Sequence, residues 1–185
     1  MAARHLLPLL LGISSCVALD VQERDSNGIK LCAELSEQVR QLDDLSERIS
    51  KRLGEPFTQR FGPDGEALDK DVLPPFVDLS ESMMLGTQGA KLIEVVTTGH
   101  FHFKCAADRR QIDSIASREF DYSVAIVWHA MAHIENRAAI LGADSVEGKL
   151  GVDAAEALRN VYLISTQLKA TAFPEAAEHG SSDES

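Results

Sequence analysis

Residues 54–79 read GEPFTQRFGPDGEALDKDVLPPFVDL and separate two strongly helical patterns. Irregular connections longer than about 12–15 residues are uncommon in compact domains. This one carries apolar side chains throughout, namely Phe57, Phe61, Leu68, Leu73 and Phe76, so we expect it to pack on the domain as an overhand crossover. A crossover lets two consecutive helices run parallel. The stretch therefore predicts an all-α protein, an up-up-down-down four-helix bundle with a long first crossover loop.

The helices on either side of this loop are read from the spacing of apolar residues. The first is expected over residues 29–53, where apolar positions recur mostly every three or four residues and Gly54 follows. The second is expected over residues 78–104, capped by Asp78 or Ser80. Its predicted core row is Leu79, Met83, Leu85, Leu92, Val95 or Val96, Phe101 and Phe103.

Two further helices are expected over residues 110–141 and 152–172. Because residues 123–134 contain no formal charge, we expect this part of the third helix to be largely buried, Trp128 included. Tyr122 also falls in its predicted core row. The connection over residues 142–151 is short for a return along a helix of this length, since ten residues span at most about 33–36 Å.

The amino terminus reads as a secretory leader. Residues 1–18 contain Arg4, an apolar run and a small residue, Ala18, before the expected cleavage site. A bacterial lipobox ending at Cys16 is the alternative. No later stretch is long and apolar enough to span a bilayer. We therefore expect a secreted domain over residues 19–173, without membrane insertion, followed by a disordered acidic tail over residues 174–185.

The chain has 185 residues and a formal net charge of −11 at pH 7. Nucleic acid is therefore not an expected partner, because phosphate binding needs a basic surface. Once the leader is removed, Cys32 and Cys105 remain. In a bundle whose first two helices are parallel they would lie at opposite ends, about 30 Å apart by helix rise, so no disulfide is predicted between them.

His129 and His133 are four residues apart on one helix and could reach a common metal ion. The further ligands of such a site are missing, and both residues fall opposite the core row. They are predicted to be surface residues. No motif of nucleophilic catalysis or phosphate binding is present, so we expect neither an enzyme nor a cofactor.

Several motifs resemble the long-chain helical cytokines of the ciliary neurotrophic factor, cardiotrophin and cardiotrophin-like cytokine group, within the interleukin-6 class. Residues 53–57, Leu-Gly-Glu-Pro-Phe, are similar to the Gly-x-Pro-Phe of that group at the exit of the first helix. Residues 73–74, Leu-Pro, and 77–79, Val-Asp-Leu, resemble the start of its second helix.

The resemblance implies a secreted cytokine that assembles class I cytokine receptors of the interleukin-6 receptor class. It also implies a contact site for a leukaemia-inhibitory-factor type receptor, because residues 146–149 correspond to the Phe-x-x-Lys motif of the group. The predicted receptor-binding residues are Val146, which stands in place of Phe, and Lys149. We expect the cytokine to be a monomer.

Two alternatives remain open. One is a secreted or lipid-anchored helical protein that binds a metal or another ligand through His129 and His133. The other is an acidic helical structural protein that has no cell-surface receptor.

Overall fold

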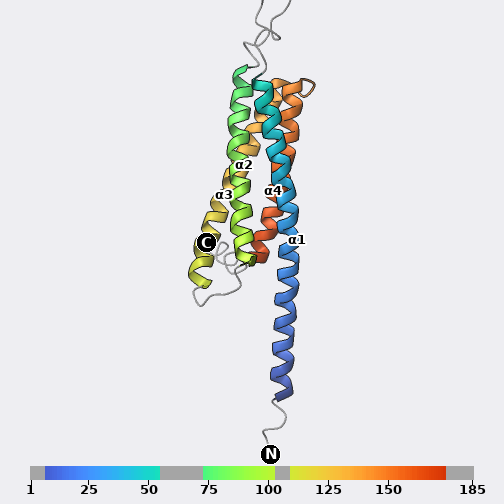
Figure 1. Cartoon of the computed structure of the whole chain (residues 1–185), viewed down its shortest axis with the longest axis vertical. Coiled ribbons are helices and arrows are strands. Elements are labelled where there is room, and N and C mark those ends of the chain that lie inside the picture. Colours follow the sequence, from blue (N-terminus) through green and yellow to red (C-terminus); the bar gives the residue numbers. More distant parts are fainter. Residues whose placement is uncertain (1–6, 55–72, 103–108, 174–185) are drawn as a thin grey trace, which may run out of the picture.

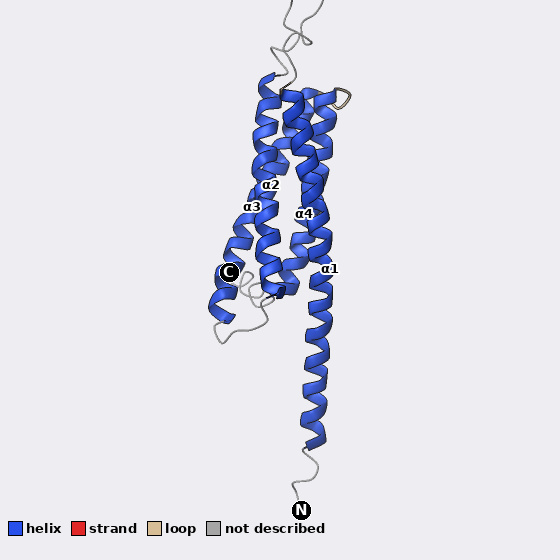
Figure 2. Ribbon diagram, viewed as in Figure 1, coloured by secondary structure: helices blue, strands red, loops and turns tan. Residues whose placement is uncertain are grey.

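The computed structural model describes residues 7–54, 73–102 and 109–173, with side chains described from Ser26 in the first helix and from Ala116 in the third. These residues form four helices, and none of them is in a strand. The helices are α1 (Leu7–Leu53), α2 (Leu73–His102), α3 (Arg109–Leu141) and α4 (Val146–Ala172). They lie side by side as a four-helix bundle (Figure 2), so the predicted all-α class is confirmed.

The contacts between α1 and α2 show that these helices run in opposite directions. Asp43, ten residues before the end of α1, forms an ion pair of 2.7 Å with Lys91. Gly28, fifteen residues earlier in α1, lies against the ring of Phe101, ten residues later in α2. The expected parallel α1–α2 pair is therefore wrong, and so is the up-up-down-down order that depends on it.

The same reversal holds at the other sequential contacts. The pairs that fix it are Asp78–Arg137 and Gly89–Val127 between α2 and α3, and Glu135–Arg159 and Asp121–Lys169 between α3 and α4. Contacts between α1 and α4 close the ring, and α2 touches α4 across the bundle. The bundle is up-down-up-down, as the colours along the chain show in Figure 1.

Chain connectivity explains why the parallel arrangement was wrong. A long loop permits a crossover but does not require one, because each doubling of loop length costs only about 0.6 kcal/mol. The predicted crossover residues Phe57, Phe61 and Leu68 lie outside the described residues. By contrast, α3 and α4 are joined by residues 142–145 alone, and so short a link joins antiparallel neighbours.

All four helices begin earlier than the sequence predicted, although α3 does so by one residue only. α2 starts at Leu73, because Pro74 and Pro75 occupy its first turn, where a missing backbone N–H is tolerated. This early start brings Phe76 into the core, where its side chain is fully buried. α4 begins at Val146 and α1 at Leu7.

The leader over residues 1–18 and its cleavage site stay predictions. The tail over residues 174–185 lies outside the described residues.

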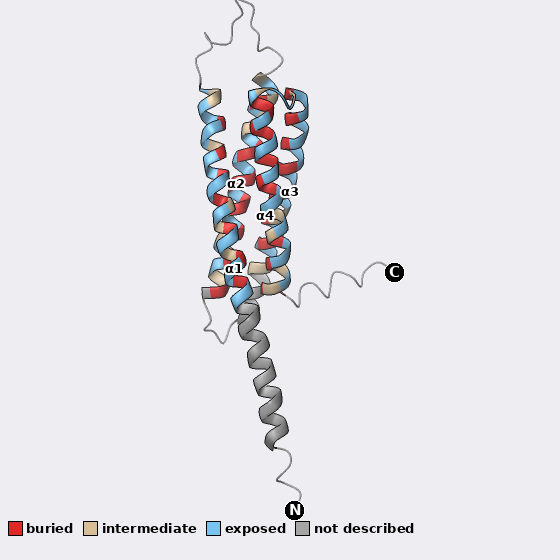
Figure 3. Cartoon of the chain, turned by 90° about the vertical axis from the view of Figure 1, so that its right-hand side faces the viewer, coloured by how far each residue is buried: buried red, intermediate tan, exposed pale blue. Residues whose placement is uncertain are grey.

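The core lies along the axis of the bundle, and each helix turns one side toward it. Figure 3 shows the buried residues on the inward sides and the exposed residues on the outward sides. The largest fully buried side chains are Phe76, Phe120, Leu35, Leu42, Ile49, Leu79, Met83, Ile93, Ile134, Leu158, Leu168 and Val127. The complete buried row of α1 has the spacing of three and four residues that predicted this helix: Leu31, Leu35, Val39, Leu42, Leu45 and Ile49.

Two aromatic residues of α3 are more exposed than expected. Trp128 is 47% exposed and Tyr122 is 65% exposed, so the prediction that they belong to the core is wrong. The buried row of α3 passes through Val127 and Ile134 instead. One helical residue corresponds to a rotation of about 100°, which moves Trp128 onto the side of α3 that faces α4, where its ring packs against Tyr162 with centroids 5.2 Å apart.

Small residues let the helices approach closely. A Cβ atom placed on Gly151 of α4 would lie 2.7 Å from the Cβ of Ala138 on α3 and 2.7 Å from Leu79 on α2. Gly86 of α2 has comparably little room, since its added Cβ would lie 2.9 Å from Leu158. These glycines are required by helix packing, although glycine is a poor helix former.

Substituting these glycines tests the close packing. Gly151→Ala should lower the free energy of unfolding by about 1–3 kcal/mol, because the rigid Ala138 backbone cannot move aside. Gly99→Ala is the control, since nothing lies within 4 Å of its added Cβ, and it should stabilise the protein by up to about 1 kcal/mol. Urea unfolding followed by circular dichroism measures both. Equal effects of the two substitutions would contradict the α3–α4 packing described here.

Candidate functional site

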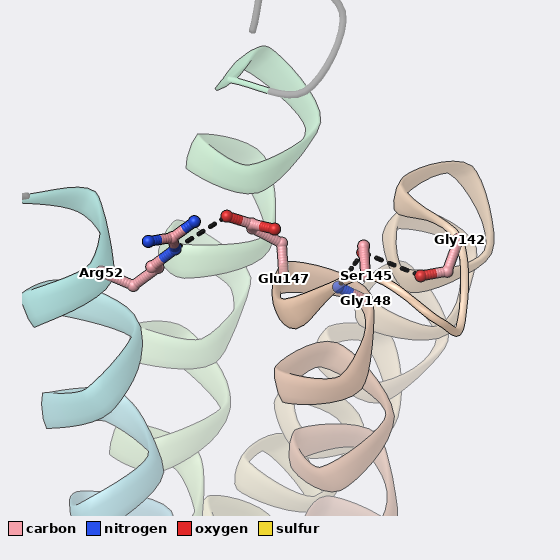
Figure 4. Close-up of polar contacts among 5 residues, drawn as sticks. All are labelled: Arg52, Gly142, Ser145, Glu147 and Gly148. Carbon is pink, nitrogen blue, oxygen red and sulfur yellow. Dashed lines mark hydrogen bonds and ion pairs between the residues drawn. The ribbon is translucent and has the colours of Figure 1, made fainter. Parts of the chain in front are cut away.

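The turn between α3 and α4 is held in a fixed shape. Gly142 directly follows α3 and has a φ of +84°, a backbone conformation that residues other than glycine rarely adopt. Ser145 then caps α4: its hydroxyl accepts a hydrogen bond from the Gly148 N–H at 2.8 Å and donates one to the Gly142 carbonyl at 2.8 Å (Figure 4). This N-cap explains why α4 begins at Val146 rather than at the predicted residue 152.

Gly148 has no room for a side chain. A Cβ at this position would lie 1.9 Å from the Gly142 carbonyl oxygen, which is far inside van der Waals contact. The carbonyl belongs to the backbone of the turn and cannot rotate away independently. Glycine is therefore required at position 148, for a reason that the sequence motif alone did not show.

An ion pair fastens this turn to the end of α1. Arg52 Nε lies 2.8 Å from Glu147 Oε1, and the two side chains are only 29% and 11% exposed (Figure 4). Arg52 is in the last turn of α1 and Glu147 is in the first turn of α4. Each charge therefore also interacts favourably with the dipole of its own helix. Neither Arg52 nor Glu147 was predicted to have this role.

The predicted receptor-binding residues lie on the outside of this fixed turn. Val146 is 57% exposed, and Lys149 is exposed. Among the described residues, Lys149 has no ion-pair partner, whereas the intervening Glu147 and Gly148 are buried. We call residues 146–149 the α4 head. It presents one apolar and one cationic side chain on a backbone that three separate contacts hold in place.

A shallow hollow lies beside the α4 head, between α3 and α4. Its volume is about 440 Å³. Its lining residues are Glu135, Ala138, Ala139, Ala143, Val152, Ala155, Glu156 and Arg159. Val152, one turn beyond Lys149, is 47% exposed at its edge, so the apolar surface at the head continues along α4.

His129 and His133 are both exposed, as the sequence predicted. The Nδ1 atom of His133 lies 2.9 Å from the Ser82 hydroxyl on α2 and forms a hydrogen bond with it. Within the described ranges, no group of three or more His, Cys, Asp or Glu side chains is arranged to hold a metal ion. A third ligand for this histidine pair is therefore missing there, and no observation favours the metal-binding alternative.

Cys32 is a free thiol between α1 and α2. Burial raises its pKa; the nearby charge of Glu94 also raises it, and a hydrogen bond with Thr97 acts in the opposite direction. The thiolate fraction at neutral pH is correspondingly low. Cys105 lies outside the described residues. Because α1 and α2 are antiparallel, the predicted separation of Cys32 and Cys105, which assumed parallel helices, has no support.

The outer face of α2 carries a second exposed surface. Five apolar side chains lie on it, and we call them the α2 stripe: Val77 38%, Met84 52%, Leu85 52%, Leu92 49% and Val95 68% exposed. Leu85 and Leu92 were predicted to lie in the core, and this was wrong. Of the two alternatives Val95 and Val96, Val96 is the one that packs against the core. The buried row of α2 runs through Phe76, Leu79 and Met83, so α2 is apolar on two sides.

Comparison of the chain with protein-family models, curated proteins and solved structures found no significant match. The resemblance to helical cytokines therefore rests on the quoted motifs alone. Along the described part of the chain, no helix contains an apolar stretch of the length needed to cross a membrane.

Removing the Arg52–Glu147 pair tests how the α4 head is held. Glu147→Ala leaves the partly buried guanidinium of Arg52 without this acceptor, and we expect a loss of about 1–3 kcal/mol in unfolding free energy. Glu156→Ala, an exposed acidic residue two turns along α4, is the matched control and should change it by no more than about 0.5 kcal/mol. Thermal and urea unfolding measure both, and indistinguishable variants would contradict a structural role for the pair.

Proposed function

We propose that this protein is a secreted helical signalling ligand, and that it acts by binding a cell-surface receptor through the α4 head rather than by catalysis. The supporting observation is the combination of exposure and rigidity at this head. Val146 and Lys149 face outward, while the Ser145 cap, the close contact at Gly148 and the Arg52–Glu147 pair fix the backbone between them. A fixed backbone reduces the entropy lost when a surface binds its partner.

The chemistry of the α4 head suits a protein surface. Lys149 offers a cation with no ion-pair partner among the described residues, on a chain whose net charge is −11. A receptor surface with a carboxylate opposite Lys149 and an apolar patch opposite Val146 and Val152 would complement it. The adjoining hollow provides a shallow depression for one inserted side chain.

The receptor class is a separate part of the proposal. Class I cytokine receptors of the interleukin-6 receptor class are the first to test, because residues 146–149 resemble a receptor contact of that cytokine group. The up-down-up-down order differs from the order expected for that group, so the fold adds no support for this class. The α4 head and its exposed residues do not depend on the class.

Reversing the charge at Lys149 tests the contact. Lys149→Glu should weaken binding to receptor-bearing cells at least about tenfold, equivalent to about 1.4 kcal/mol, while helicity and melting temperature stay nearly unchanged. Arg118→Glu makes the same change in charge on an exposed residue of α3 near the other end of the bundle. It should bind as the wild type does. Flow cytometry with fluorescently labelled protein measures all three.

The proposed receptor contact at the α4 head is contradicted if Lys149→Glu binds with unchanged affinity to every receptor that captures the wild type. If Arg118→Glu weakens binding as strongly, the effect comes from total charge and not from a contact at Lys149.

The mass of the protein released into the culture medium tests the proposed secretion. Cells expressing the full chain should release a protein that begins at Leu19, because the leader is removed after Ala18. Intact-mass measurement of the culture medium determines this. A full-length protein retained in the cells, or one carrying an acyl chain on Cys16, would contradict the proposed secretion.

A further inference from the structure

The hollow between α3 and α4 is lined mainly by small apolar side chains. Ala138, Ala139 and Ala143 contribute to it from the end of α3 and the turn, and Val152 and Ala155 contribute from α4. Its volume of about 440 Å³ is within the range of about 300–1,000 Å³ that is usual for binding pockets. Because alanine side chains are short, the hollow is broad and shallow. This shape suits a flat aromatic ring.

Three charged side chains line the same hollow. Arg159 forms an ion pair with Glu135, and a paired guanidinium keeps its flat face available for stacking on an aromatic ring. Glu156 is exposed, and among the described residues its carboxylate has no ion-pair or hydrogen-bond partner. The hollow therefore offers a cation to a ring and a carboxylate to a hydrogen-bond donor.

These charges select among the side chains that fit the hollow. A carboxylate would be repelled by Glu135, by Glu156 and by Asp144, which is exposed in the adjoining turn. A lysine or arginine would lie beside the guanidinium of Arg159. A leucine or phenylalanine would take water from Glu156 without donating a hydrogen bond, which costs free energy. Tyrosine has a ring for Arg159 and an O–H for Glu156, and it loses little conformational entropy on binding.

The hollow and the α4 head share one face of α4. Lys149, Val152 and Glu156 are spaced by three and four residues, so they lie on the same side of the helix. Glu156 is about 10 Å farther along the helix axis than Lys149. Asp153, the remaining acidic residue between them, pairs with Arg48 of α1. One partner can therefore contact Lys149 and reach the hollow at the same time.

We propose that the hollow binds a tyrosine side chain of the receptor that contacts the α4 head. The ring lies on the alanine side chains beside Arg159, and the phenol O–H donates a hydrogen bond to the Glu156 carboxylate. The inference rests on the proposed receptor function. It adds a requirement for the receptor, namely a tyrosine and an acidic residue whose side chains reach points about 10 Å apart, which about three residues of extended chain span.

The first experiment fills the hollow. Ala139→Leu should weaken binding to receptor-bearing cells at least about tenfold, because the added side chain occupies the place of the ring. Ala132→Leu is the matched control, since Ala132 is exposed seven residues earlier on the same side of α3 and does not line the hollow. It should bind as the wild type does. Flow cytometry with labelled protein from cells expressing the full chain measures both, and circular dichroism establishes that each variant is folded.

Measuring Lys149→Glu beside these variants separates the two proposals. Wild-type affinity of Ala139→Leu with weak binding of Lys149→Glu overturns the tyrosine contact and leaves the receptor contact at the α4 head in place. Wild-type affinity of both overturns both proposals. Equal weakening by Ala132→Leu and Ala139→Leu also overturns the tyrosine contact, because the effect then does not come from the hollow.

The second experiment needs no receptor. Nuclear magnetic resonance titration of the isotope-labelled protein with millimolar N-acetyl-tyrosinamide should shift the amide signals of Ala139, Ala143 and Val152, and Ala139→Leu should abolish these shifts. The corresponding derivatives of phenylalanine, tryptophan and lysine should give smaller shifts. The proposal is overturned if the tyrosine derivative shifts none of these signals, or if one of the other three shifts them as strongly.

Discussion

The bundle depends on the close approach of α2, α3 and α4 at small residues. Gly89 of α2 meets Val127, with 3.1 Å between an added Cβ and a side-chain carbon, and Gly151 of α4 meets Ala138. Side chains at these points would push the helices apart and open the core at Phe76 and Phe120. The glycines lower helix propensity locally, but they allow contacts along three helices.

The second constraint acts at one end of the bundle, where local and long-range contacts coincide. The Ser145 cap and the glycine at 148 shape a four-residue turn, and Arg52 reaches Glu147 across 95 positions in sequence. Because the local hydrogen bonds and the long-range ion pair hold the same few residues, the exposed positions 146 and 149 have little freedom. The result is a short stretch of surface with a defined shape.

The sequence predicted the number and type of helices well, and their order poorly. The apolar row from Leu31 to Ile49 is unambiguous, whereas the uncharged middle of α3 predicted a helix but did not show which of its sides is buried. The order was wrong because a long connection such as 54–79 permits a crossover without requiring one. The link after α3 restricts direction, and it is shorter in the structure, residues 142–145, than the predicted 142–151. For α2, apolar residues on two sides gave no way to tell the buried row from the exposed one.

At the candidate site, the exposure of Val146 and Lys149 follows from their motif. The roles of Glu147 and Gly148 depend on their contacts with Arg52 and Gly142, and no pattern in the sequence reveals these contacts.

The antiparallel order also fixes how the molecule would be displayed from an attachment point. Gly28 contacts Phe101, and His100 contacts Phe173 with ring centroids 5.1 Å apart, so the described chain enters and leaves the bundle at the same end. The turn around Ser145 is at the opposite end (Figure 1). A support joined where the described chain enters or leaves the bundle would therefore leave residues 146–149 at the end of the bundle farthest from it.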